Sequence, residues 1–183
     1  MAFRTIGSVE LNSIAMGIYA ADEMIKAAQV ELIVARTTCP GRYLVMVAGD
    51  TGSVESAVET GREIGRAAVI DWFVIPSVHD SVMPALSGTT LSPRIDALGV
   101  IETSTTVACI LAADAAAKAG LVTLLEIRSA AGMAGKSFVT MTGDVGSVEA
   151  SVAAGVEGAG DSGPVLSHVV IPSPSEDLKN KLL

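Results

Sequence analysis

The amino-acid sequence contains one pattern twice. Gly49 to Glu55 (GDTGSVE) returns as Gly143 to Glu149 (GDVGSVE), and Ala20-Ala21-Asp22 returns as Ala112-Ala113-Asp114. The offset between matching positions is 92 residues at the alanine motif, 94 at the glycine motif and 96 between Pro76 and Pro172, so the copies differ by two small insertions. Each half of the 183-residue chain must therefore fold into the same kind of unit, with its own core.

The duplication also separates residues that serve the fold from residues with a special task. A position kept in both halves is expected to serve folding or assembly, whereas a reactive group present once is a functional candidate. Cys39 is such a group, because the matching position in the second half is Ala131 or a close neighbour. Cys109 lies in an apolar stretch of a predicted helix, and we interpret it as a small buried hydrophobe.

Composition excludes several classes of partner. The chain has 12 Lys and Arg against 20 Asp and Glu, a net charge of −8, which predicts no nucleic-acid binding. No uninterrupted apolar run reaches the roughly 18 residues of a membrane helix, so we expect no membrane partner. Half of the residues are nevertheless hydrophobic, which favours surface buried between subunits.

Hydrophobic periodicity predicts the order strand, helix, strand, strand, helix, strand in each half. The first half has β-rich runs at 5–11, 31–38, 43–48 and 69–75, and helical apolar spacing from Ile14 to Ala28 and from Val54 to Ile64. The second half repeats this order. We therefore expect an α/β fold of two tandem domains, each an antiparallel sheet with helices packed on it.

Residues typical of turns and loops give the predicted domain limits. Short segments at 78–86 and 174–183 suit a terminal helix or turn in each half. The stretch 87–96 contains Gly88, Pro93 and several Ser and Thr residues, as linkers do. The predicted domains are 1–86 and 97–183, with 87–96 as the linker.

Other polar motifs have structural interpretations. Asp50 and Asp144 are predicted to cap the helices that follow them. Gly135-Lys136-Ser137 ends like a phosphate loop, but the full spacing is missing and a strand follows, so we expect no nucleotide site. Glu10 and Glu102 match through duplication and are interpreted as capping or interface groups, because an acid–base pair must converge on one substrate. We find no nucleophile with a base and expect no enzyme.

Several motifs in order resemble the bacterial microcompartment shell domain. They are IGSVE at 6–10, AADEMIKAA at 20–28 and GDTGSV at 49–54, with LGVIE at 98–102, AAD at 112–114 and GDVGSV at 143–148 in the second copy. The resemblance covers nearly the whole chain, and each half begins at the family's usual first strand, without permutation. The segment from Thr38 to Tyr43 (TCPGRY) is similar to tandem shell proteins of the propanediol-utilisation T type.

This resemblance implies a homotrimer that forms a pseudo-hexameric tile among other hexameric shell proteins, in a microcompartment shell within the cytoplasm. It also implies that the loop after the second strand of each half lines a central pore. The implied pore-lining residues are Thr38, Pro40, Gly41, Ala131, Gly132, Met133 and Ala134.

The resemblance further implies subunit-edge roles for Lys26 and Lys118. Each lies four residues after an aspartate, so an ion pair on a solvated helix is the alternative interpretation. The chain also departs from the family, because many single-domain shell proteins carry Arg after the Ile-Pro turn, where this chain has Ser77 and Ser173. Edge contacts are therefore expected to differ from those of the hexamers.

In the T type, the residue that matches Cys39 holds an iron–sulfur cluster. The resemblance thus implies one 4Fe–4S cluster per trimer, bound by one cysteine from each chain, with the remaining iron open to water or a small molecule. Zinc suits three ligands less well, because structural zinc sites close with four protein ligands. The cluster would carry electrons from an encapsulated redox enzyme across the shell, or be delivered whole to enzymes inside.

Two other functions remain open at this stage. One is a shell tile with a plain metabolite pore and no cluster. The other is a trimeric regulator that binds a small molecule between its subunits.

Overall fold

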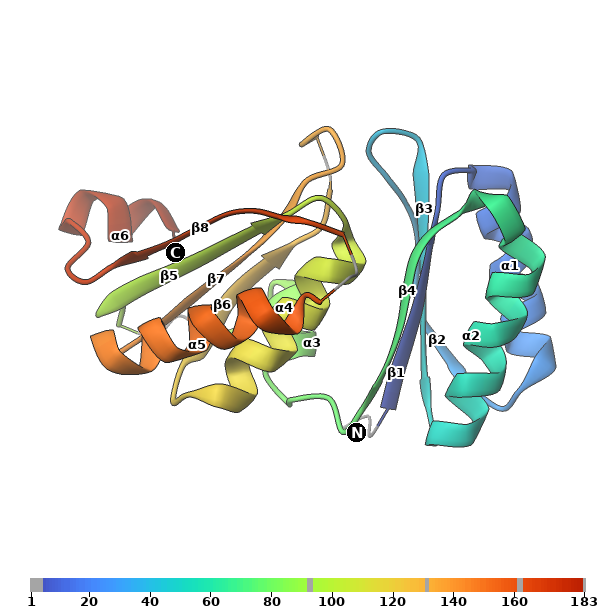
Figure 1. Cartoon of the computed structure of the whole chain (residues 1–183), viewed down its shortest axis with the longest axis horizontal. Coiled ribbons are helices and arrows are strands. Elements are labelled where there is room, and N and C mark those ends of the chain that lie inside the picture. The colour runs from blue at the N-terminus through green and yellow to red at the C-terminus, as the bar shows by residue number, and fades with distance from the viewer. Residues whose placement is uncertain (1–4, 92–93, 131, 161–162, 183) are drawn as a thin grey trace. The chain divides into compact units, whose positions relative to one another are not determined.

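The duplication appears as two four-stranded antiparallel sheets in the computed structural model, which describes residues 5–91, 94–130, 132–160 and 163–182 (Figure 1). The elements are β1 (Thr5–Leu11), α1 (Ile14–Ala27), β2 (Glu31–Thr38), β3 (Arg42–Gly49), α2 (Thr51–Gly65), the 3-10 turn η1 (Arg66–Ala68), β4 (Val69–Pro76), α3 (Val82–Ser87), β5 (Ala97–Thr103), α4 (Thr106–Ala119), β6 (Thr123–Arg128), β7 (Ser137–Gly143), α5 (Val145–Gly158), β8 (Val165–Ile171) and α6 (Glu176–Leu182). The predicted α/β fold with two tandem antiparallel sheets is confirmed.

The two sheets have the same topology and register. The first has the order β2-β3-β1-β4 and the second β6-β7-β5-β8. Glu10 pairs with Leu44 on β3, and its counterpart Glu102 pairs with Phe138 on β7. Against the outer strand, the register shifts directly after Glu10 in one sheet and directly after Glu102 in the other. The duplication has therefore kept the irregularities of the sheet as well as its order.

The chain divides into two compact units that interleave along the sequence. Unit 1 contains the residues up to Val78 together with the short segments Thr105–Val107 and Ala130–Gly135. Unit 2 contains His79–Ser104, Ala108–Ser129 and the residues from Lys136 onward. The continuous domains predicted from the sequence, 1–86 and 97–183 with the linker 87–96, stay a prediction.

Helices cover one face of the first sheet and close its core. In Figure 1, α1 and α2 lie side by side on that face. Val9 and Val45 from the sheet, Met24 from α1, and Val54 and Val58 from α2 form one buried cluster. The apolar stripes predicted for both helices thus face the sheet, as burial of apolar area requires.

The predicted helix caps are present in both halves. Asp50 accepts a hydrogen bond from the amide of Ser53 at 3.0 Å, and Asp144 accepts one from the amide of Ser147 at 3.0 Å. Each carboxylate thereby satisfies an amide in the first turn, where the helix offers no acceptor. Among the described residues, no helix combines the length and the apolar character that crossing a membrane requires.

Gly7 and Gly99 occupy matching strand positions where a helix approaches the sheet closely. A Cβ atom at Gly7 would lie 2.5 Å from Val58 Cγ2, and one at Gly99 would lie 2.8 Å from Val152 Cγ2. We expect Gly7→Ala and Gly99→Ala each to lower the free energy of unfolding by about 1–3 kcal/mol, because the added methyl group forces helix and sheet apart. Urea unfolding followed by circular dichroism measures the change.

Gly52, in the first turn of α2, is the control for that prediction. The nearest atom to a Cβ at this position is Asp50 Oδ1, at 3.7 Å. Gly52→Ala is expected to leave stability unchanged or raise it by up to about 1 kcal/mol, because alanine favours the helix. Equal stability of Gly7→Ala and Gly52→Ala would contradict the packing argument.

Candidate functional site

The loop that carries Cys39 contacts the segment Ala130–Gly135 within unit 1. The Cys39 amide donates to the carbonyl oxygen of Ala130 at 2.8 Å, and the Gly132 amide donates to Cys39 Sγ at 3.4 Å. The two loops that the resemblance placed at a pore, 93 residues apart at this contact, therefore meet around the sulfur. Ala131 itself lies outside the described residues.

Glycines allow these loops their tight turns. Gly41, Gly132 and Gly135 have φ angles of 79°, 75° and 95°, in the region that side chains disfavour. A Cβ atom at Gly135 would lie 3.2 Å from Pro40 Cδ, so the two loops pack closely.

The other residues predicted to line a pore differ in exposure. Pro40, Gly41, Gly132 and Ala134 are exposed, and Met133 is half-buried. Thr38 is buried, and its Oγ1 has no hydrogen-bond partner in the part of the chain that the structure describes. Their role as pore-lining residues stays a prediction.

The two cysteines have different surroundings. Cys39 is a free, partly exposed thiol whose sulfur accepts an amide hydrogen bond. Cys109 is buried, and this burial raises the pKa of its thiol to about 12, so it stays protonated. The interpretation of Cys109 as a core residue is thereby confirmed.

The described residues of one chain do not assemble a metal site by themselves. Over the described ranges, no group of three or more His, Cys, Asp or Glu side chains is placed to hold a metal ion. A metal site at Cys39 would therefore need ligands beyond those that the described residues of one chain bring together. An exposed thiol with an amide donor fits that use, because hydrogen bonds to ligating sulfurs are a regular part of such sites.

A fully buried carboxylate in unit 1, that of Glu10, lies beside the first two residues of α4. Glu10 accepts hydrogen bonds from Arg42 Nη1 at 3.1 Å, from the amide of Thr106 at 2.9 Å and from the amide of Val107 at 3.4 Å. Thr106 and Val107 are the first residues of α4, so Glu10 binds a helix N-terminus. Burial raises the pKa of Glu10, and the hydrogen bonds with Arg42 and the amides only partly oppose this. The sequence-based interpretation as a capping group is confirmed.

Asp71 extends this contact and was missed from the sequence. Thr105 Oγ1 donates to Asp71 Oδ2 at 2.8 Å, and both side chains are buried. The available signal was an aspartate inside the apolar strand VIDWFVIP, since a buried carboxylate must find donors.

The predicted ion pairs of both repeated lysines are present. Lys26 Nζ pairs with Asp22, on an exposed part of α1. Lys118 Nζ lies 2.6 Å from Asp114 Oδ2, and Asp114 Oδ1 also accepts the amide of His79 at 2.8 Å. Ion pairing does not test the subunit-edge roles, which stay predictions.

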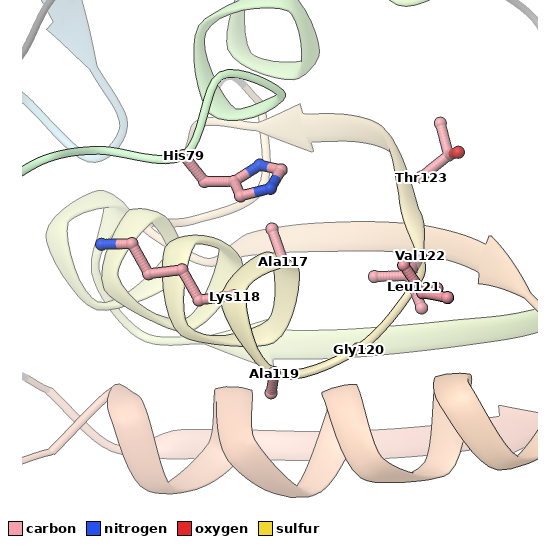
Figure 2. A pocket seen from close by; sticks show the side chains of 8 residues that line it. All are labelled: His79, Ala117, Lys118, Ala119, Gly120, Leu121, Val122 and Thr123. Atoms are coloured by element: carbon pink, nitrogen blue, oxygen red, sulfur yellow. The ribbon is translucent and has the colours of Figure 1, made fainter.

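Unit 2 contains a hollow of about 600 Å³ beside the end of α4 (Figure 2). Figure 2 shows His79 and Lys118 on one side of it and Leu121, Val122 and Thr123 on the other. Lys118 is already paired with Asp114, and His79 Nδ1 lies 2.8 Å from Ser81 Oγ. We therefore assign this hollow no ligand.

The chain is similar to known proteins over most of its length. A family model described as the BMC domain matches residues 5–78 and 97–174. The bacterial microcompartment shell protein PduT of Citrobacter freundii is 41% identical over 180 residues, 98% of each chain. The carboxysome shell protein CcmK2 of Synechococcus elongatus is 42% identical over 85 residues, 45% of this chain and 81% of that protein.

A solved structure agrees with this result. The crystal structure of a microcompartments protein from Desulfitobacterium hafniense has a TM-score of 0.86 and 52% sequence identity. The match covers 96% of this chain and 98% of that one.

The raised pKa of Glu10 predicts a pH dependence of stability. Folding favours the protonated carboxyl, so its contribution to the free energy of unfolding is greatest below 4.5, the ordinary pKa, and is lost as pH rises through the folded-state pKa. We expect the difference in unfolding free energy between wild type and Glu10→Gln to fall as pH rises from about 4 to 7. Urea unfolding at a series of pH values measures this difference. Glu126→Gln is the control, and the same pH trend in that variant would count against the assignment to Glu10.

Proposed function

This chain belongs to the BMC-domain family of bacterial microcompartment shell proteins, and we propose that three copies form a pseudo-hexameric tile with Cys39 at its central pore. The predicted family and the predicted structural, non-enzymatic role are confirmed by the similarities over the whole chain. The trimer, the pore and any cofactor are the parts that we propose.

The contact at Cys39 is the observation that carries the proposal. Its sulfur lies in an exposed loop, accepts the amide of Gly132 and has no second thiol near it for a disulfide. A three-fold axis beside this loop would gather one such sulfur from each chain. We propose that these three thiolates hold a 4Fe–4S cluster.

Each part of the site would have a defined task. Cys39 supplies the ligand, and the Gly132 amide orients its sulfur and donates to it. The exposed Pro40, Gly41 and Ala134 would form the rim around the axis. A bound cluster supplies one-electron redox chemistry, so we propose electron transfer between the two sides of the shell.

The partners follow from the same proposal. PduT and CcmK2 are themselves shell proteins, which supports assembly of this tile with other shell proteins. Electron transfer across the shell would further require a redox enzyme inside it as the source or acceptor of electrons.

Iron and acid-labile sulfide, measured after anaerobic purification, test the cluster. We expect about four iron and four sulfide per three chains in the wild type, and loss of both in Cys39→Ser, because no other described cysteine is exposed. Cys109→Ser is the matched control and should keep the cluster.

Sedimentation of the same samples separates the cluster from the tile. Equal iron in the wild type and Cys39→Ser would overturn the cysteine assignment. A trimer without iron or sulfide would overturn the cluster and leave a tile with a plain pore. A monomeric wild type would overturn the tile.

A further inference from the structure

Two matching ion pairs of the repeat have different surroundings. The Glu10–Arg42 pair in unit 1 is at 3.1 Å, with side chains 0% and 21% exposed. The Glu102–Lys136 pair in unit 2 is at 2.7 Å, with the Glu102 side chain 32% exposed and the Lys136 side chain 55% exposed. The two glutamates occupy the same register position in their sheets, so the pairs are true counterparts.

In the Glu10–Arg42 pair, the carboxylate also accepts hydrogen bonds from the start of α4. The amides of Thr106 and Val107 donate to Glu10 Oε2, which leaves that carboxylate fully buried and supplied with donors. Glu102 has the same strand position and the same kind of cation beside it. Among the described residues of a single chain, Glu102 has no counterpart to the pair of amides that Glu10 receives.

The start of α1 offers matching amides. Ile14 and Ala15 are the repeat counterparts of Thr106 and Val107, at the offset of 92 residues that also relates Asp22 to Asp114. The first amides of a helix have no acceptor within it. At α1, the Ser13 hydroxyl accepts the later amide of Met16, at 3.3 Å.

The apolar surface of α1 agrees with a missing partner. Ile18 is 55% exposed, whereas its counterpart Ile110 on α4 is 0% exposed. Ile14 and Ile25 are each 40% exposed on the same helix. A helix that is repeated in the chain and buried in one copy thus leaves apolar side chains uncovered in the other.

We propose that Glu102 of one chain accepts the amides of Ile14 and Ala15 at the start of α1 in a second copy of the chain. This contact would repeat between chains the contact that Glu10 makes with Thr106 and Val107 inside one chain. The negative carboxylate suits the positive end of the helix dipole. The inference rests on the proposed trimer and names the residues that close it.

The arrangement is compatible with the proposed ring. Each chain carries one acceptor, Glu102, and one donor, the start of α1, at different places on its surface. Repeated head to tail, such a contact forms a closed ring when the rotation between neighbours completes a circle.

Glu102→Gln tests the acceptor. We expect the concentration at which the trimer dissociates to rise at least about tenfold, because a hydrogen-bonded charge is lost at every interface. Sedimentation velocity across a dilution series measures this concentration. Glu126→Gln is the matched control, since Glu126 is a 34% exposed, ion-paired glutamate of the same unit, and it should dissociate like the wild type.

Ile14→Pro tests the donor. Proline at the first helical position removes one amide and is well tolerated there. The preceding residue, Ser13, already has the extended φ and ψ of −140° and 122° that a following proline requires. We expect weaker trimers with unchanged helix content by circular dichroism.

The outcomes distinguish this inference from the proposed function. A wild-type trimer that dissociates at the same concentration as Glu102→Gln and Ile14→Pro overturns the inference and leaves the tile intact. Equal weakening by Glu102→Gln and Glu126→Gln overturns it as well, because a general charge effect would then explain both. A monomeric wild type overturns the proposed tile together with this contact.

Discussion

The buried carboxylate of Glu10 is the interaction on which unit 1 depends. It is fully buried near the end of β1, an inner strand of the sheet, where an unpartnered charge would cost several kcal/mol. Arg42 from the next strand and the first amides of α4 supply the donors that make burial tolerable. Removing one of these partners leaves the Glu10 carboxylate with too few donors in a site that solvent does not reach. The carboxylate therefore ties β1, β3 and the start of α4 together.

The Cys39 loop is connected to the hydrogen-bonded contacts of Glu10. Arg42, which pairs with Glu10, begins β3 directly after the turn that contains Cys39 and Pro40. The segment Ala130–Gly135 then contacts that turn through two hydrogen bonds. The position of the sulfur is therefore set by the fold of unit 1 and by glycine-rich turns.

The sequence predicted the elements well for a physical reason. Alternation in the strands and the spacing of apolar residues in the helices are local patterns, and capping aspartates such as Asp50 act within three residues. The repeat gave each assignment a second example. The contact of Glu10 with Thr106, by contrast, joins residues 96 positions apart, and the contact of Asp71 with Thr105 joins residues 34 positions apart. No local sequence pattern specifies such pairs. The thiol environment of Cys39 was likewise invisible until the two loops were placed together.

The hydrogen bond from Gly132 to Cys39 has an evolutionary consequence. In a ring of six identical domains, one loop sequence must serve every position, so a change to the thiol and a change to its donor occur six times at once. Fusion of two domains places the sulfur in one loop and the amide in the other. Selection can then adjust the amide donor without changing Cys39, and gene duplication becomes a means of tuning the surroundings of a single thiol.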